Sequence, residues 1–465
     1  MNPLFKAEVY QDRRNRLKKS VKSGIAVFLG NGEASMNYPS NTYKYRQDSN
    51  FLYFFGLSIA DIAAVIDFDE GRDIIFGNDF EIDDIIWMGS QPKLASLAEQ
   101  VGVKEVLPMK QLAEYIQSAQ KAGRKVHFTP PYRGDNKIWL SNLTGINVND
   151  IRDHASVELI KGIVDLRSAK EACEIEQMED ACKIGYMLHT GIMHHCIPGI
   201  KELELAGIAE GITLSYGNGV SFPVILSQHG ETLHNHGHAA TLEKGKMLLV
   251  DAGAENLMNY CSDNTRTLPV GGQFTPKQKE IYEIVLQANM DGIEAAAPGV
   301  YNRDLHAMAC ETIAKGLSEL GIMKGDVKEA VRQGAHALFM PHGLGHQLGL
   351  DVHDMEDLGE QYVGYDDTVR RSDVFGWDAL RMARELRPGF VITIEPGIYF
   401  IPQLIDIWKS EHKFEQFINY DKVEEYRDFG GIRVEDDVLI TPEGHKVLGP
   451  AIPKTVKDLA DIIGK

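Results

Sequence analysis

Long helical segments that alternate with short apolar runs constrain the fold of this chain more than any other feature. Apolar residues recur at helical spacing from Ile175 onward, over 276–297 and over 302–320, as amphipathic helices require. Pro298 and Gly299 separate the last two segments. Between the helical segments lie short apolar runs that each end in an acidic or histidine-rich stretch. This mixture predicts an α+β fold in which strands carry polar side chains at their ends.

The chain is long enough for two domains. Its 465 residues exceed the roughly 250–300 residues at which a single hydrophobic core usually stops growing. Before residue 164, apolar runs mix with helical stretches, which suggests a smaller N-terminal domain of α/β or α+β type. These runs and stretches are 25–29, 63–66, 74–76, 91–101 and 112–122. We therefore predict an N-terminal domain over residues 1–165 and a C-terminal domain over residues 166–465.

The composition argues against several classes of function. Asp and Glu outnumber Lys and Arg by 67 to 48, which gives a formal charge of −19, whereas nucleic-acid backbones are held by clustered Lys and Arg. The chain lacks the roughly 18 consecutive apolar residues of a membrane span. Its N-terminal charges precede no apolar stretch, and its five cysteines form no C-x-x-C pair. We therefore expect a cytoplasmic protein with reduced, buried thiols and with no nucleic-acid or membrane partner.

Two segments of the C-terminal part place acidic and histidine side chains beside apolar runs. In GKMLLVDAGAENLMNYCSDNTRT an apolar run leads to Asp251, and a second strand-like piece presents Asp263. A single Asp in such a place is usually a turn or capping residue. In FMPHGLGHQLGLDVHD three histidines stand among glycines, which let backbone and ligand come close. These are His342, His346 and His353, and neutral imidazole can ligate a metal or carry a proton.

Two further segments end or alternate in carboxylates. In GFVITIEPGIYF a β-branched run ends at Glu395, and the following proline stops regular strand pairing. In GGIRVEDDVLIT the period of two predicts a strand that places Arg433, Glu435 and Asp437 on one face. Alone, each carboxylate would be an ordinary surface charge. The stretch 401–429 between these segments is predicted to be a surface excursion joining two strands.

Together the segments supply four carboxylates and one imidazole, namely Asp251, Asp263, His346, Glu395 and Glu435. Isolated buried carboxylates are costly unless they are paired or bound to metal. Two divalent ions would balance the formal charge, and oxygen-rich ligation suits Mn²⁺ better than structural zinc. Bridging carboxylates can hold two ions about 3.5–4 Å apart, with a hydroxide between them as nucleophile.

These four segments resemble the metal motifs of the aminopeptidase P and prolidase family. The N-terminal segment YRQDSNFLYFFGL is similar to the family's non-catalytic domain. The resemblance covers nearly the whole chain and implies a C-terminal pita-bread catalytic domain with a smaller N-terminal α/β domain of the creatinase and prolidase type. It also implies a metallopeptidase that hydrolyses the bond between an N-terminal residue and proline, with the five residues above as metal ligands.

The resemblance assigns further roles around the metals. Asp263 and Glu435 would bridge the two ions. His234, in ETLHNHGHA, and His353 would position the peptide and stabilise the tetrahedral intermediate. Glu395 would also move the proton toward the departing proline nitrogen. His342 would line the same substrate pocket, and Arg433 would support the metal ligands.

The sequence leaves several activities open. The stretch LRMARELRPG resembles the dipeptidases of the family, in which Arg381 would bind the free carboxylate of a dipeptide, since the planar guanidinium suits carboxylates. We favour the aminopeptidase and keep the dipeptidase, prolidase, as the alternative. A metal-free amidinohydrolase of the creatinase type and a non-catalytic binding protein are more distant, because both should lack the five ligands.

The resemblance also implies a homodimer or homotetramer in which the N-terminal domain helps to enclose a neighbouring site. Trp87, in IIWMG, is a candidate for that wall. A large aromatic side chain more often packs in the core of its own domain, and we predict this buried position for Trp87.

Overall fold

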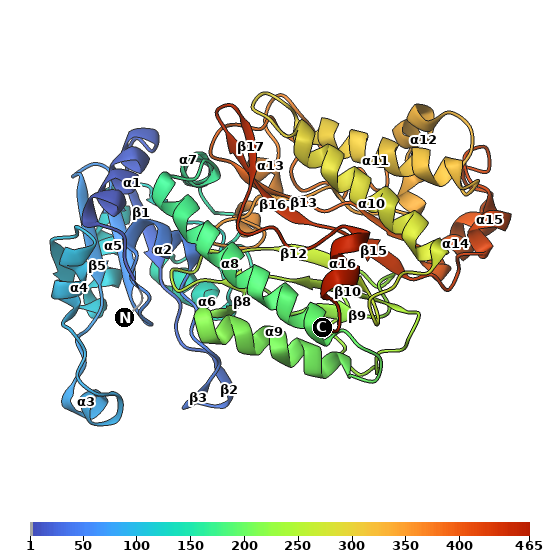
Figure 1. Ribbon diagram of the computed structural model, residues 1–465. Coiled ribbons are helices and arrows are strands. Elements are labelled where there is room, and N and C mark those ends of the chain that lie inside the picture. Colours follow the sequence, from blue (N-terminus) through green and yellow to red (C-terminus); the bar gives the residue numbers. More distant parts are fainter. Residues whose placement is uncertain (1–2) are drawn as a thin grey trace. The chain divides into compact units, whose positions relative to one another are not determined.

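The computed structural model describes residues 3–465, which divide into two compact units (Figure 1). One unit comprises Met1–Arg167 and the short segment Met355–Tyr362. The other comprises Ser168–Asp354 and Val363–Lys465. The sequence-based division placed residues 355–362 in the C-terminal domain. This stretch carries no periodic pattern from which its grouping with the first unit could have been predicted.

The smaller unit is built on a five-stranded mixed sheet with the strand order β6-β5-β4-β1-β7. Its strands are β1 Ile25–Leu29, β4 Ala63–Asp67, β5 Arg72–Phe76, β6 Glu105–Leu107 and β7 Val126–His127. The three central strands pair antiparallel, whereas both edge strands pair parallel. The apolar side chains of the central strands pack against Leu112 and Ile116 of a helix, which forms the core of this unit.

The helices of the smaller unit are α1 Ala7–Ser20, α2 Ser49–Phe55, α3 Ile82–Met88, α4 Leu94–Gln100, α5 Leu112–Lys121, α6 Gly134–Thr144 and α7 Val157–Ser168, and β2 Ser35–Tyr38 pairs with β3 Asn41–Thr42. Helix α2 lies in the segment YRQDSNFLYFFGL. Asp48 caps its first turn by accepting from the backbone N–H of Phe51, and every residue of α2 is buried. This segment is therefore a structural core element of its unit.

The prediction that Trp87 is buried in its own core is wrong. Trp87 lies on α3 and is 86% exposed, and Ile82 and Ile86 of the same helix are exposed as well. Figure 1 shows α3 standing away from the sheet of its unit. No residue of α3 is buried, so the apolar content of this helix did not indicate a core position.

The larger unit begins with two helices that pack on each other, α8 Ala172–His195 and α9 Glu202–Tyr216. Helix α8 starts at a capping box formed by Glu171 and Glu174, which satisfies backbone N–H groups of its first turn. An antiparallel sheet in the order β12-β10-β9 follows, made of β9 Ile225–Ser227, β10 Met247–Ala252 and β12 Asn264–Pro269. Strand β8 Gly219–Val220 pairs with β11 Ala254–Glu255.

The second half of this unit repeats the plan of two helices followed by strands. Helices α10 Pro276–Ala295 and α11 Asn302–Glu319 pack on each other, and α10 starts with a proline behind the capping residue Thr275. The strands form one sheet in the order β13-β16-β17 and a separate pair of β14 with β15. Their bounds are β13 Val391–Ile394, β14 Gly397–Tyr399, β15 Gly431–Arg433, β16 Asp436–Thr441 and β17 Gly444–Val447.

Two of our strand-level predictions need correction. The segment GGIRVEDDVLIT is not one continuous strand, because β15 ends at Arg433 and β16 begins at Asp436. Glu435 lies between the two strands, and Asp437 does not share the pocket with it. The stretch 401–429 is more than a surface excursion. It contains α14 Pro402–Ser410 and α15 Tyr420–Glu424, which bury Trp408 and Val423 in the apolar core.

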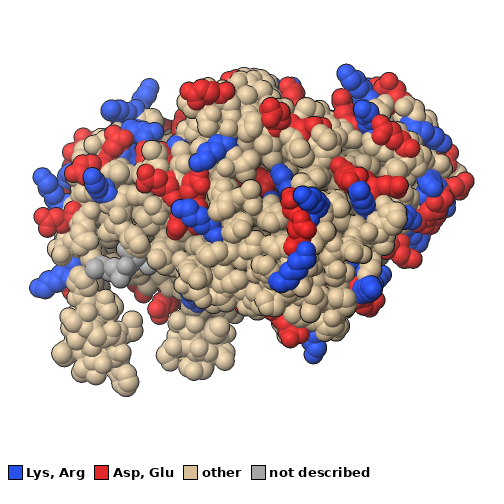
Figure 2. Space-filling view, in the orientation of Figure 1, with Lys and Arg blue, Asp and Glu red and all other residues tan. Residues whose placement is uncertain are grey.

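The larger unit also contains the short helices α12 Val327–Gln333 and α16 Val456–Ile462, whereas α13 Glu360–Val363 begins in the segment that is grouped with the smaller unit. No helix within residues 3–465 is long and apolar enough to cross a membrane. On the face drawn in Figure 2, Lys and Arg side chains lie among Asp and Glu side chains and form no extended basic patch.

Candidate metal centre

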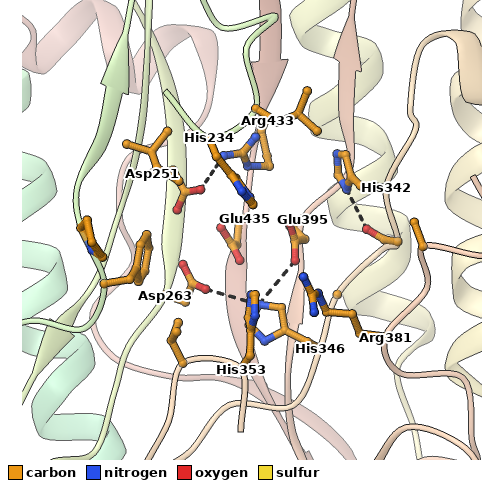
Figure 3. A pocket seen from close by; sticks show the side chains of 18 of the residues that line it. His234, Asp251, Asp263, His342, His346, His353, Arg381, Glu395, Arg433 and Glu435 are labelled. Atoms are coloured by element: carbon orange, nitrogen blue, oxygen red, sulfur yellow. Dashed lines mark hydrogen bonds and ion pairs between the residues drawn. The ribbon is translucent and has the colours of Figure 1, made fainter. Parts of the chain in front are cut away.

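The ten side chains that the sequence analysis singled out line one cavity of about 600 Å³ in the larger unit (Figure 3). They are His234, Asp251, Asp263, His342, His346, His353, Arg381, Glu395, Arg433 and Glu435. The cavity has the size of a small-molecule or peptide site. Its apolar lining includes Phe222, Ile225 and Leu233, which the sequence analysis missed because apolar pocket residues look like core residues.

The two aspartates lie on adjacent strands. Asp251 belongs to β10, and Asp263 immediately precedes its antiparallel neighbour β12. Nη2 of Arg433 donates to Oδ2 of Asp251 at 2.5 Å. The backbone N–H of Asp263 donates to Oδ2 of Asp437 at 3.1 Å. Both aspartates are buried, and within residues 3–465 the Oδ1 atom of each has no hydrogen-bond partner.

His346 presents one ring nitrogen to the carboxylates. Its Nδ1 lies 3.0 Å from the carbonyl oxygen of Gln347 and donates to it, so the lone pair resides on Nε2. Nε2 lies 3.4 Å from Oδ2 of Asp263 and 3.6 Å from Oε1 of Glu395. The preceding Gly345 is required for this approach, because a Cβ there would lie 1.9 Å from the carbonyl oxygen of Thr393. The loop therefore holds the imidazole in the orientation of a metal ligand.

Both glutamates lie at strand ends. Glu395 directly follows β13, and Glu435 occupies the gap between β15 and β16. Oγ1 of Thr393 donates to Glu395 at 3.2 Å, and Oγ1 of Thr265 donates to Glu435 at 2.6 Å. Nε of Arg433 donates to the same Thr265 hydroxyl at 3.0 Å. The hydroxyls leave the opposite oxygens of both carboxylates available to a ligand.

Three carboxyl groups of the cavity have pKa values above their ordinary range. Burial raises the pKa of Asp263 well above its ordinary value, and the charge of Asp251 raises it further. Burial and the charge of Asp263 likewise raise the pKa of Glu435 well above its usual range. Burial raises the pKa of Glu395 as well. These groups cannot all ionise in a desolvated pocket without a compensating cation.

The residues fit divalent metal ions. Ligand atoms of Asp263, His346 and Glu435 all lie within 4.8 Å of one another, and all three residues are buried. The unpartnered Oδ1 atoms of Asp251 and Asp263 are two further oxygens that water does not reach. Carboxylate oxygens with one imidazole are a donor set for hard or borderline divalent cations. Bound cations would relieve the repulsion that raises these pKa values.

A hydrogen-bonded chain supports the centre from one side. Nη1 of Arg433 donates to the hydroxyl oxygen of Tyr399 at 2.8 Å, and this hydroxyl donates to Nε2 of His342 at 2.9 Å. Nδ1 of His342 in turn donates to the carbonyl oxygen of Gly343 at 2.8 Å. Burial and the charge of Arg433 lower the pKa of His342 to about 3, so this imidazole is neutral. The sequence analysis missed Tyr399, which is buried on β14 and looked like an ordinary strand residue.

Three side chains extend the cavity beyond the carboxylates. The His353 ring lies 4.3 Å from the ring of His346, centroid to centroid, at a T-shaped angle of 66°. Burial and the charge of Arg433 lower the pKa of His234, which favours its neutral form. Figure 3 shows the guanidinium of Arg381 reaching toward the side of the cavity that holds His346 and Glu395. The cavity thus joins a carboxylate cluster to imidazole side chains and a guanidinium.

This unit is of α+β type and carries a buried cluster of carboxylates and histidines at converging strand ends. Together these features indicate a metal-dependent hydrolytic enzyme. The model of metallopeptidase family M24 matches residues 176–442, and that of the aminopeptidase P N-terminal domain matches residues 10–127. The chain belongs to metallopeptidase family M24.

Individual relatives agree with this family. The Xaa-Pro dipeptidase of Homo sapiens is 33% identical over 96% of this chain and 90% of the relative. A protein of Aspergillus clavatus described as "Probable Xaa-Pro aminopeptidase" is 31% identical, over 90% of this chain and 88% of the relative's length. The structure of an Escherichia coli aminopeptidase P variant in complex with substrate is similar with a TM-score of 0.81, 27% identity and coverage of 99% and 98% of the two chains. The fold of this chain is therefore that of the aminopeptidase P structures, with the catalytic domain C-terminal.

Removing metal is expected to destabilise the protein more as the pH rises. In metal-free protein the raised pKa values of Asp263 and Glu435 keep protons bound that the unfolded chain has already lost, so stability falls with rising pH. Bound metal displaces these protons and removes the dependence. The difference in unfolding free energy between metal-loaded and chelated protein should widen by about 1.4 kcal/mol per pH unit for each proton displaced. Thermal or urea unfolding of both forms from about pH 5 upward measures it, because the dependence begins above the ordinary carboxyl pKa and ends at the raised one. A difference that is constant or shrinks from the lowest pH onward would contradict the assignment.

Proposed function

We propose that this protein is an Xaa-Pro peptidase, which hydrolyses the peptide bond between an N-terminal residue and the proline that follows it. The observation that carries the proposal is the convergence of Asp251, Asp263, His346, Glu395 and Glu435 on one cavity. Relatives that are named Xaa-Pro dipeptidase and Xaa-Pro aminopeptidase align over about nine-tenths of the chain or more. The apolar lining by Phe222 and Leu233 suits a proline ring.

We propose that the five residues would hold two divalent metal ions, and that Asp263 and Glu435 would serve both. The oxygen-rich set favours Mn²⁺. When bound, such a pair supplies Lewis acidity toward the scissile carbonyl and lowers the pKa of water toward about 7. Arg433 holds Asp251 in place through its 2.5 Å contact and receives support from Tyr399. The orientation of the ligands then depends on Arg433 and Tyr399, which are not ligands themselves, and Arg433 would also face the substrate because it lines the cavity.

The remaining side chains would handle protons and developing charge. Glu395, whose Oε1 accepts from Thr393, would move a proton from the attacking water toward the proline nitrogen. The raised pKa of Glu395 in its buried position suits a group that both accepts and donates a proton. Imidazole N–H groups of His353 and His234 would donate to the carbonyl oxygen as negative charge develops on it. His342 would line the substrate pocket beside them.

Peptide length separates the aminopeptidase from the dipeptidase. The sequence favours an aminopeptidase, which should cleave Ala-Pro-Pro at least as well as Ala-Pro. The presence of Arg381 in the cavity lining supports the second candidate, a dipeptidase in which the guanidinium binds the free carboxylate of the dipeptide. Measuring kcat/KM for both peptides with metal-reconstituted protein tests the proposal. Turnover of neither peptide would overturn the Xaa-Pro assignment itself.

Replacing Arg381 by Ala distinguishes the two candidates at one residue. If the guanidinium binds the dipeptide carboxylate, the KM for Ala-Pro is expected to rise about 10- to 150-fold, as for loss of a charged hydrogen bond of about 1.5–3 kcal/mol. The KM for Ala-Pro-Pro should change much less. Arg387, which is exposed in the same LRMARELRPG stretch and does not line the cavity, provides the matched control Arg387→Ala. Equal effects on both peptides would remove Arg381 from carboxylate recognition.

Three broader predictions stay part of this proposal. We divide the chain into a non-catalytic domain over residues 1–165 and a catalytic domain over residues 166–465. We propose a cytoplasmic location, which the five free cysteines support. We also propose a homodimer or homotetramer, for which the exposed Trp87 offers an apolar contact. Light scattering of wild type and of Trp87→Ser tests the last of these.

A further inference from the structure

A second cluster of metal-binding side chains lies outside the catalytic cavity. His306 and Cys310 are one turn apart on α11, and His336 lies in the 3₁₀ turn Ala335–Leu338 that follows α12. A nitrogen of each histidine and the sulfur of Cys310 all lie within 4.8 Å of one another. All three residues are fully buried, and none of them lines the cavity described above.

The polar atoms of this cluster are poorly satisfied by the protein. Within residues 3–465, neither ring nitrogen of His336 meets the geometric criteria of a hydrogen bond; the carbonyl oxygen of Val331 is near enough to act on the ring but already accepts from Trp377. Sγ of Cys310 lies 3.6 Å from Nε2 and 3.9 Å from Nδ1 of His306, which are long and weak contacts. Buried polar groups are nearly always paired, so unpaired imidazole nitrogens that face a thiol require an explanation.

The surroundings keep both imidazoles uncharged. Burial lowers the pKa of His306 to about 4 and the pKa of His336 to about 3. Both rings therefore carry a free nitrogen lone pair at physiological pH. Burial raises the pKa of the Cys310 thiol, so an ion that binds its sulfur must displace the proton. The cluster without an ion is a set of three neutral, soft donors.

The side chains that pack on the cluster are apolar or aromatic, and Glu311 on α11 is the acidic group whose charge acts on Cys310. The cluster lies in the apolar core of the larger unit, beside Ala337, Leu338 and Ile313. The indole of Trp377 stands edge-on to both imidazoles, with ring centroids 4.9 Å from His306 and 6.1 Å from His336. Its Nε1 donates to the carbonyl oxygen of Val331 at 3.1 Å. Among the three ligands, only the Cys310 thiolate can supply negative charge to an ion held in this apolar core.

We propose that His306, Cys310 and His336 form a buried site for a soft monovalent metal ion of the Cu⁺ type. A Cys thiolate and two neutral imidazoles around Cu⁺ make a complex without net charge, whereas Zn²⁺ would leave a positive charge in an apolar core. Zn²⁺ also takes four ligands in closed sites, and the described part of the chain, residues 3–465, supplies three in this cluster. On binding, the Cys310 S–H bond breaks, an S–Cu bond forms, one proton leaves to solvent, and copper remains monovalent.

The site would stabilise the region that leads into the catalytic loop. His336 precedes His342 by a few residues, and α11 packs against α12. An ion that joins α11 to the turn after α12 cross-links two elements of the folded chain and binds the unfolded chain poorly. Binding is therefore expected to raise the melting temperature without taking part in peptide hydrolysis.

A competition titration tests the site in the full-length protein. Protein is stripped of metal, reloaded with Mn²⁺ and titrated anaerobically with Cu⁺ against the chromophoric chelator bicinchoninate. Wild type is expected to bind about one equivalent, and Cys310→Ala at least about tenfold more weakly, because the thiolate selects Cu⁺. Cys196→Ala is the matched control, since Cys196 is equally buried in the same apolar core. X-ray absorption at the copper edge should show one sulfur and two nitrogen ligands in wild type.

Several results would overturn the proposal. Wild type that takes up no Cu⁺, a Cys310→Ala variant that binds it as tightly as wild type, or a copper spectrum without sulfur would each exclude the site. Preferential uptake of Zn²⁺ over Cu⁺ would overturn the choice of ion. It would be detected after exchange with Co²⁺, as a thiolate-to-Co²⁺ charge-transfer band that Cys310→Ala abolishes. If Cys310→Ala fails to fold, Cys310→Ser serves instead, because oxygen is a poor Cu⁺ ligand. Peptidase activity with Mn²⁺ checks that each variant is folded.

Discussion

Replacing Glu435 by Gln is expected to lower turnover of an Xaa-Pro peptide at least about 10³-fold, equivalent to about 4 kcal/mol of transition-state stabilisation. Glu435 is buried, lies within 4.8 Å of the ligand atoms of Asp263 and His346, and accepts from Thr265 at 2.6 Å. The neutral amide removes one negative charge from the ligand set and offers only one oxygen. Metal should therefore be held more weakly, and activation of water should fail.

Metal content and turnover measured on the same samples test this prediction. Elemental analysis after Mn²⁺ reconstitution should show less metal in Glu435→Gln than in wild type, whereas wild-type metal content with wild-type turnover would contradict the ligand assignment. Asp436→Asn is the matched control, because Asp436 is the next residue, is equally buried and does not line the cavity. It accepts from Arg266 at 2.6 Å and from Lys454 at 2.7 Å. Breaking these pairs should cost about 3–5 kcal/mol of stability while metal is retained.

The sequence was informative about the fold wherever local pattern and burial agree. The helical spacing over 276–297 and 302–320 corresponds to α10 and α11, since each helix turns one apolar face to the core. The β-branched run before Glu395 is strand β13, all of whose residues are buried. Strand ends were found because an apolar run that stops at a carboxylate marks where the chain leaves the core. These features depend on neighbouring residues, which a sequence displays directly.

The parts that escaped prediction depend on contacts between distant residues. Glu435 lies in the break between β15 and β16, where its backbone N–H donates to Thr265 of β12 instead, and nothing in the alternating letters of GGIRVEDDVLIT marks this break. Tyr399 supports Arg433 from another strand, β14. Trp87 is exposed although large aromatic residues are usually buried. The unusual environment of Cys310 likewise arises only when His336 folds beside α11.

The catalytic centre also explains why the fold tolerates so many buried charges. Asp251 is paired with Arg433, whereas Asp263 and Glu435 have no basic side chain as a hydrogen-bond partner among the contacts within residues 3–465. Their pKa values are raised first by burial and then by repulsion from the charges of neighbouring carboxylates, and the rest of the core must offset both costs. Bound cations convert this repulsion into attraction, so metal binding and folding are thermodynamically linked in this unit.

Replacing His353 by Ala is expected to lower turnover about 10²- to 10³-fold, the usual effect of removing one donor to a developing oxyanion. His353 lines the cavity, and its ring stacks edge-on against that of His346 at 4.3 Å. His353 is not among the residues that offer the unpartnered carboxylate oxygens, Asp251 and Asp263, nor is it in the cluster of ligand atoms from Asp263, His346 and Glu435. The variant should therefore keep its metal while losing the group that stabilises charge on the substrate.

His346→Ala provides the contrast, because the two imidazoles are neighbours with different assigned roles. Nε2 of His346 lies 3.4 Å from Asp263 and 3.6 Å from Glu395, so its removal should lower both metal content and turnover. In His353→Ala, turnover alone should fall, with kcat affected more than KM because the donor acts mainly in the transition state. Metal loss in His353→Ala equal to that in His346→Ala would make His353 a ligand, and unchanged turnover would exclude it from catalysis. Elemental analysis and steady-state kinetics on both variants, each reconstituted with Mn²⁺, distinguish these outcomes.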